Sequence, residues 1–325
     1  MNRRSEKSYF VPPYLSDEKA KDNAFRTRRI VKSDLEARPS AAYIGTGEAK
    51  RFVYDSNHTT FQQLKLARKE GGTRVDDETV NTAYEYAGVI RAFFKRQLSY
   101  DSYDNKGSDL IFNVHYGQDY NNAFWDGDEM TFGDGDGKMF TSFVNSLDVT
   151  GHELGHGVVQ FTANLDYEKE AGALNEHYAD VFGSAIKQNA LKQSAKDANW
   201  LIGDTIVGPS FPGKAIRSMT APGSAYKGDP QPAHMDQFYK GSDDYYGVHI
   251  NSGIPNKIFA TVSLAVTTPK ALAVWFAALK QLKFDASFAA FKTAINAAAK
   301  ASERSGDLPK GSLQHFTDAF ASVGL

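Results

Sequence analysis

Residues 148–160 read DVTGHELGHGVVQ, and the rest of the chain can be interpreted from this stretch. On an α-helix, side chains four residues apart lie one above the other on the same face. His152 and His156 would therefore point their imidazoles at a single metal ion, with Glu153 beside them. A catalytic zinc needs a third protein ligand and a water, so the stretch alone leaves the site incomplete.

A second helical pattern, GALNEHYAD, follows at residues 172–180, with the carboxylates of Glu176 and Asp180 on one face. Glu176 would supply the missing ligand. Asp180 would accept a hydrogen bond from a metal-bound imidazole and fix its tautomer. Both could instead be solvent-facing charges, but apolar residues surround them in the sequence: Ala173, Leu174, Tyr178, Ala179, Val181 and Phe182.

The amino-acid composition limits the possible classes of function. The chain has 325 residues, 41% of them hydrophobic, and a net charge of −2, which is typical of a globular protein without a whole-chain signature of nucleic-acid binding. It has no cysteine, so disulfides, thiolate catalysis and cysteine zinc sites are excluded and any metal must be held by His and carboxylates. No apolar run is long enough to span a membrane.

Periodicity predicts two regions of different structure. Helical spacing over residues 80–100 indicates a long, half-buried helix. We expect strands at 51–54, 109–116 and 129–133. After these, helices are expected at 146–162, 172–193, 253–265, 270–282, 287–302 and 312–322.

Five separated motifs, at residues 121–125, 133–137, 151–160, 172–183 and 247–254, resemble in collinear order the thermolysin family of metallopeptidases. The resemblance covers roughly residues 100–325. It implies an α+β fold of two lobes with the zinc cleft between them. The expected lobes are a β-rich one at 46–150 with one long helix, and a mainly α-helical one at 151–325.

The resemblance also implies roles. His152, His156 and Glu176 become the ligands of one catalytic Zn²⁺, a set that is thermolysin's own and is carried over from it. Glu153 becomes the general base that takes a proton from the attacking water and passes it to the leaving amine. The expected activity is zinc-dependent endopeptidase.

Further roles follow from the same resemblance. Tyr167 and His249 would donate to the developing oxyanion, although without the resemblance both would be interpreted as structural. Asp244 would orient His249. Asn175 and Asp180 would stand behind His156 and His152.

Substrate contacts are expected at Asn122 and at the Ala123 carbonyl, which would hold an extended peptide. Arg217 would brace the carbonyl after the cleaved bond. An apolar pocket for the residue that follows this bond should favour Leu, Phe, Ile or Val. Its expected lining residues are Phe140, Phe143, Val149 and Ile216.

The chain also departs from the family. Gly155 and Gly157 replace bulkier residues, at a cost of up to about 1 kcal/mol each, and would allow closer helix packing. Lys187 stands where the family's paired calcium site has a key Glu. We therefore expect no double calcium site, and at most one weak Ca²⁺ near Asp148 and Asp204.

Other polar groups are interpreted as structural. The run DGDG at 134–137 lacks the spacing and the final Glu of an EF-hand, which favours a Gly-rich hairpin over a metal loop. The remaining histidines have no second ligand at metal spacing in the sequence: His58, His115, His177, His234 and His315.

The N-terminal segment carries ten Lys/Arg and six Asp/Glu in residues 1–38. This composition fits a solvated tail or a detachable prosegment. VPPYL at 11–15 resembles the Pro-Pro-Tyr motif of the protealysin-type subgroup, whose short prosegment masks the active site. We predict a removable inhibitory segment at 1–45, cut between Arg38 and Lys50.

No signal peptide is visible. Secretion after processing is expected, with a cytoplasmic pool or non-standard export as alternatives. Expected partners are protein or peptide substrates and the prosegment, with no nucleic acid, no membrane and a monomeric state. Two other functions stay open: a catalytically silent zinc-binding scaffold, or a related zinc aminopeptidase, which would need an acidic anchor for a free amine.

Overall fold

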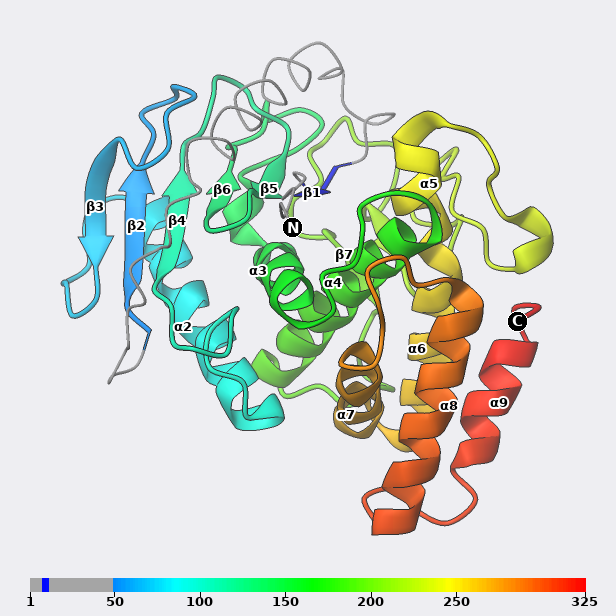
Figure 1. The fold of residues 1–325 in the computed structure, drawn as a ribbon. Helices are drawn as coiled ribbons and strands as arrows, with labels where there is room; N and C mark the ends of the chain where they lie inside the picture. Colours follow the sequence, from blue (N-terminus) through cyan, green and yellow to red (C-terminus); the bar gives the residue numbers. More distant parts are fainter. Residues whose placement is uncertain (1–7, 12–48) are drawn as a thin grey trace.

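The computed structural model describes residues 8–11 and 49–325. Figure 1 shows a sheet region on one side, a group of helices on the other, and helices α3 and α4 between them. The expected two-lobed α+β fold is confirmed. Most of the predicted prosegment and most of its predicted cutting region lie outside the described residues, so the lobe and prosegment boundaries stay predictions.

Within the described residues, the sheet has six strands in the order β1-β5-β6-β4-β2-β3. Strands β2 and β4, and β4 and β6, are parallel, whereas the other neighbours are antiparallel. Because parallel strands need a crossover connection, β2 and β4 are joined through the hairpin strand β3 and helix α2. The strands are β1 (Ser8–Tyr9), β2 (Arg51–Asp55), β3 (Lys65–Lys69), β4 (Leu110–Val114), β5 (Ala123–Trp125) and β6 (Met130–Phe132).

Helix α2 (Glu78–Leu98) is the long helix expected from the periodicity. It begins at Asp77, whose carboxylate accepts hydrogen bonds from the amides of Thr79 and Val80. Its buried face includes Ile90 and Phe94, which belong to the same hydrophobic core as the strands. Apolar spacing alone therefore predicted both the helix and its buried side.

Helices α3 (Leu147–Thr162) and α4 (Lys169–Ala190) pack closely because glycines face the neighbouring helix. A Cβ on Gly155 would lie 3.0 Å from the Ala179 Cα, and one on Gly183 would lie 2.3 Å from the Asp148 carbonyl oxygen. A side chain at Gly183 would therefore force the helices to shift, and one at Gly155 would require its neighbours to move by a few tenths of an ångström. The closer packing expected at Gly155 is present.

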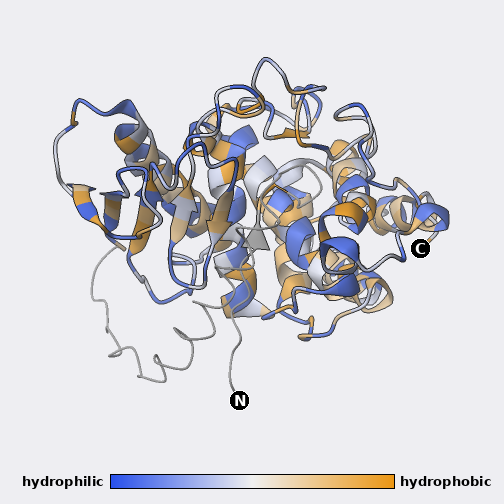
Figure 2. Ribbon diagram, turned by 90° about the horizontal axis from the view of Figure 1, so that it is seen from above, coloured by the Kyte–Doolittle hydropathy of each residue, from blue (hydrophilic) through white to orange (hydrophobic). Residues whose placement is uncertain are grey.

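The C-terminal region is mainly helical, and its helices carry both hydrophobic and hydrophilic stretches (Figure 2), with many of the hydrophobic residues buried. None of the described helices has the length and apolar character needed to cross a membrane. The remaining elements are β7 (Leu201–Ile202), β8 (Arg217–Ser218), α5 (Asp243–Asn251), α6 (Gly253–Val266), α7 (Thr268–Leu279), α8 (Phe288–Ser305) and α9 (Leu313–Ala321), with short 3-10 turns at Phe143–Asn145 and Met235–Gln237.

One helix was not expected. No helix was expected between residues 193 and 253, but α5 lies in this interval and carries His249. Four consecutive residues of α5, from Asp244 to Gly247, have positive φ angles, a conformation that helical periodicity does not encode. The kink explains why the sequence pattern missed the helix.

Candidate active site

Three side chains from two helices meet inside the protein. His152 and His156 come from α3 and Glu176 comes from α4, and all three are buried. The two Nε2 atoms are 2.9 Å apart, and Glu176 oxygens lie 3.5 Å from His152 Nε2 and 3.4 Å from His156 Nε2. The close α3–α4 packing is therefore what brings the third ligand to the two histidines.

Hydrogen bonds fix the Nδ1 atoms of both imidazoles. His152 Nδ1 lies 2.9 Å from Asp180 Oδ1, and His156 Nδ1 lies 2.9 Å from Asn175 Oδ1. Because these oxygens accept, each Nδ1 carries the proton and each Nε2 turns a lone pair inward. Asn175 is held in turn by donating to the Leu165 carbonyl at 3.1 Å.

The arrangement fits zinc. Ligands at 2.0–2.1 Å in a tetrahedron lie about 3.3 Å from one another, close to the separations seen here. The lone pairs of the two Nε2 atoms face each other beside the Glu176 carboxylate. A cation between these three groups would offset their mutual repulsion. Glu176 Oε2 is also buried without a hydrogen bond among the described residues, which is the condition of an atom that binds a metal.

Glu153 lies in the same buried space on α3 and has no side-chain hydrogen-bond partner among the described residues. Burial, and secondly the neighbouring Glu176 carboxylate, raise the pKa of Glu153 well above its ordinary value. A carboxyl group with a raised pKa holds a proton more readily, as a general base requires.

A buried ion pair fixes the His152 side of the site. Arg217 on β8 donates two hydrogen bonds of 2.8 Å to the Asp180 carboxylate, and Asn256 on α6 donates a third at 2.8 Å. Burial opposes charge on Asp180, but Arg217 and His152 outweigh it and hold the pKa of Asp180 well below its usual range. Sequence reasoning assigned Arg217 to substrate alone and missed Asn256, a buried polar residue on α6.

Tyr167 and His249 also reach this centre. The Tyr167 hydroxyl donates a short hydrogen bond to Glu176 Oε1 and lies 3.3 Å from His249 Nε2. Asp244 accepts from both the Nδ1 and the backbone amide of His249, at 2.6 and 2.8 Å. The kink of α5 allows Asp244 to fold back in this way.

The N-terminal segment lies against the site. Strand β1 is antiparallel to β5, and the Phe10 amide donates to the Ala123 carbonyl at 3.1 Å. Asn122 Oδ1 accepts from the Val11 amide at 2.7 Å, and Asn122 Nδ2 donates to the Val11 carbonyl at 3.2 Å. Arg217 donates to the Phe10 carbonyl at 3.1 Å.

The ring of Phe10 is fully buried. It meets His152 edge-on at a centroid distance of 5.0 Å and lies 6.4 Å from the ring of Phe143, while the Arg217 guanidinium lies 4.6 Å over it. All four expected pocket residues belong to the same apolar cluster as Phe10: Phe140, Phe143, Val149 and Ile216. Sequence reasoning singled out VPPYL at 11–15 in this segment but not Phe10.

Lys187 lies between the two acids considered for calcium. Its Nζ is 2.8 Å from Asp148 Oδ2, 2.5 Å from Asp204 Oδ1 and 3.2 Å from the Leu201 carbonyl. Burial opposes the charge on Lys187, but the two carboxylates outweigh it and raise its pKa. An ammonium group thus lies between the carboxylates that a calcium ion would use.

The remaining histidines require one correction. His58 and His115 were interpreted as having no further ligand, but the fold brings both to Asp134. The interpretation of His177 as structural fits its position, since its ring is buried between Asn256 and Trp275. Spacing in the sequence could not reveal His58 and His115 because they are 57 residues apart and on separate segments.

A buried zinc centre with a free carboxylate beside it, held between two helices, places the chain among the metal-dependent hydrolases. Residues 15–160 match the family model "Thermolysin metallopeptidase, catalytic domain", and residues 163–325 match "Thermolysin metallopeptidase, alpha-helical domain". The chain belongs to the thermolysin family of metallopeptidases. It is a zinc metalloendopeptidase.

Individual relatives agree with this assignment. Protease PrtS of Photorhabdus sp. (strain Az29) is 40% identical over 309 residues, which cover 86% of this chain and 83% of that protein. An extracellular metalloprotease of Pectobacterium carotovorum subsp. carotovorum is 43% identical over 255 residues, covering 75% and 74%. The structure of the precursor of protealysin from Serratia proteamaculans superposes with a TM-score of 0.84 at 38% identity, covering 98% of this chain and 99% of that one.

Proposed function

We propose that this zinc endopeptidase is made as a zymogen and cleaves peptide bonds on the N-side of bulky apolar residues. The observation that carries the proposal is the binding of Phe10 and Val11. Their backbone groups pair with Asn122, Ala123 and Arg217, the groups expected to hold a substrate. The segment around Phe10 therefore acts as an intramolecular substrate mimic and inhibitor.

The apolar specificity rests on the same contacts. Arg217, expected to brace the carbonyl after the cleaved bond, binds the carbonyl of Phe10, which puts Phe10 in the position of the residue that follows this bond. Its ring is fully buried among apolar side chains. Burying a Phe or Leu side chain contributes about 1.5–3 kcal/mol, whereas an unpaired charge there would be strongly disfavoured.

The proposed catalytic roles are those implied by the family resemblance, and the geometry supports them. When bound, zinc polarises a peptide carbonyl and makes a water nucleophilic at neutral pH. Glu153, with its raised pKa, takes the proton of that water and gives it to the leaving amine. Tyr167 and His249, joined to each other and to Glu176, donate to the oxyanion.

A blocked peptide library tests activity and specificity together. We expect the processed protein to cut peptides with Leu, Phe, Ile or Val after the bond, as read by mass spectrometry. Glu153→Gln should abolish cleavage while zinc content stays the same. Cleavage of free-amine peptides alone would indicate an aminopeptidase, and zinc binding without cleavage by the unmutated protein would indicate a scaffold.

Processing and export are tested separately. The name of the Pectobacterium relative, an extracellular metalloprotease, supports secretion of this chain as well. N-terminal sequencing of active protein should find a start between residues 38 and 50, and active protein that retains Met1 would reject the zymogen. Size-exclusion chromatography should give a monomer.

A further inference from the structure

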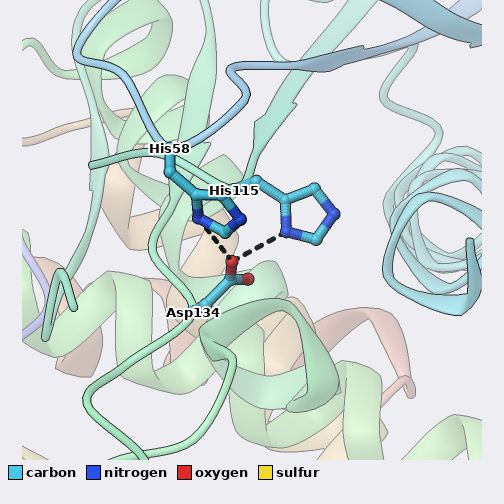
Figure 3. A group of neighbouring side chains, drawn as sticks. All are labelled: His58, His115 and Asp134. Atoms are coloured by element: carbon cyan, nitrogen blue, oxygen red, sulfur yellow. Dashed lines mark hydrogen bonds and ion pairs between the residues drawn. The ribbon is translucent and has the colours of Figure 1, made fainter. Parts of the chain in front are cut away.

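Three side chains outside the zinc centre converge on one another. His58 lies in the turn after β2, His115 directly follows β4, and Asp134 lies two residues after β6. Asp134 Oδ2 is 2.7 Å from His115 Nδ1 and 3.5 Å from His58 Nδ1, and Figure 3 shows both rings directed at this oxygen. One ligand atom from each residue lies within 4.8 Å of the others.

The backbone fixes the two histidines. The His58 amide donates to the His115 carbonyl at 2.8 Å. Both residues have positive φ angles, 57° for His58 and 54° for His115. Residues other than glycine adopt this region uncommonly, and such conformations cluster at functional sites. The two rings are therefore brought together by a hydrogen-bonded backbone arrangement in which both residues have left-handed φ angles.

Further contacts orient the cluster. His115 Nε2 lies 2.9 Å from Asp77 Oδ2, while the other oxygen of Asp77 caps helix α2. Asp134 Oδ1 accepts from the Ser142 hydroxyl at 3.3 Å. Metal-bound histidines usually donate their second N–H to a carboxylate in this way, which leaves the first nitrogen free to bind the ion. Asp77 is thus placed to orient His115 as a ligand.

A simpler interpretation is a protonated His115 between two carboxylates. It accounts for the two short contacts of His115, but it gives no role to His58. The His58 side chain is 51% exposed, so burial does not hold it in place, yet its Nδ1 faces the same oxygen. A cation shared by both imidazoles and Asp134 accounts for all three positions.

We propose that His58, His115 and Asp134 bind a second divalent ion of the zinc type, separate from the catalytic one. Two imidazole nitrogens and one carboxylate oxygen are ligands that suit Zn²⁺, and they do not suit Ca²⁺ or Mg²⁺, which prefer oxygen alone. The exposed side of His58 leaves the ion open to water.

The position of this second site implies its effect. The ion would join the turn after β2, the end of β4 and the loop that begins at Gly133. The Gly133 amide donates to the Asn122 carbonyl at 3.0 Å, so this loop supports a residue that we assign to substrate binding. Binding of the ion should therefore stabilise the β-rich lobe.

Zinc stoichiometry tests the proposal on the full chain carrying Glu153→Gln, which should prevent self-cleavage. After the catalytic site is filled with one equivalent, isothermal titration should show a second equivalent that excess Ca²⁺ does not displace. His58→Gln and Asp134→Asn should each reduce the total to one equivalent. His315→Gln, which changes an exposed histidine on α9, should retain two.

Two results would overturn the second site: a single equivalent in the parent protein, or two equivalents in both His58→Gln and Asp134→Asn. Because His58 is half-exposed, His58→Gln should melt at the parent temperature in chelator, which shows that its fold is intact. No readout depends on peptidase activity, so failure here would leave the proposed function untouched.

Discussion

At the scale of single residues, the Tyr167 hydroxyl contacts both Glu176 and His249. If it donates to the oxyanion, its removal should affect the transition state more than substrate binding. Tyr167→Phe should lower kcat about 10²-fold with little change in KM, measured on a blocked peptide. Tyr178→Phe, which removes a buried hydroxyl near the Trp275 carbonyl, should keep kcat. A tenfold rise in KM at constant kcat would contradict the role of Tyr167.

Lys187 offers a second prediction at this scale, because it neutralises the fully buried Asp148. Lys187→Met would leave a carboxylate in the interior with its cation removed. Breaking a buried pair from one side costs about 3 kcal/mol, so we expect a loss of that size in urea unfolding at saturating zinc.

Two further variants serve as controls for Lys187→Met. Lys270→Met, at an exposed position of α7, should change stability little, and Asp148→Asn should recover part of the loss caused by Lys187→Met. A loss below about 1 kcal/mol would show that the pair is solvated. Two tight calcium sites in the unmutated protein would contradict our expectation for this region.

The site residues differ in how far they could be predicted from the sequence. His152, His156 and Glu176 were predictable because ligands on two helices obey the four-residue period and because the motifs match a family. His58, His115 and Asp134 were not, because strand order brings them together and no local period records it. Phe10 was missed for the same reason, since its partners lie more than a hundred residues away.

At the scale of elements, the distance between α3 and α4 sets the zinc centre. A Cβ on Gly183 would lie 2.3 Å from the Asp148 carbonyl oxygen and 3.3 Å from the His152 amide nitrogen. Gly183→Ala should therefore push the helices apart and separate His152 from Glu176. We expect a loss of stability of about 1–3 kcal/mol and zinc affinity lowered at least about tenfold, measured by competition with a chelator.

Gly155→Ala provides a graded comparison with Gly183→Ala. Its Cβ would meet the Ala179 Cα at 3.0 Å and the Phe182 ring at 3.2 Å, which is tight but involves no contact as short as that at Gly183. Its effects should be smaller. Equal zinc affinity in Gly183→Ala and the parent would show that the helix spacing can change without moving the ligands.

The sequence predicted some helices and strands better than others. Helices with regular apolar spacing, such as α2 and α3, appear within two or three residues of the expected positions. Strands β7 and β8 have only two residues each, which is too short for a period to be seen. Helix α5 lies across a kink with positive φ angles, so tertiary contacts rather than propensity determine it.

At the scale of the whole molecule, the segment around Phe10 connects the two lobes. Its amide pairs with Ala123 on the sheet, and its carbonyl and ring contact Arg217 and His152 beyond it. In the proposed zymogen, Phe10 would occupy the place of a substrate residue, and the inhibition would depend on the burial of one apolar ring. Replacing a buried Phe by Ala costs about 3–5 kcal/mol of stability. Here part of that loss would weaken the docking of the segment against the site.

We therefore expect Phe10→Ala, in the full chain carrying Glu153→Gln, to open the site. A blocked peptide with Phe after the bond should bind this variant at least tenfold more tightly than it binds the parent, as measured by titration calorimetry. Phe112→Ala, which removes a buried ring on β4, should destabilise the protein without this gain in binding. Unchanged peptide affinity in Phe10→Ala would mean that the segment is held by its backbone pairs alone, because the hydrogen bonds through Asn122 and Arg217 survive the loss of the ring.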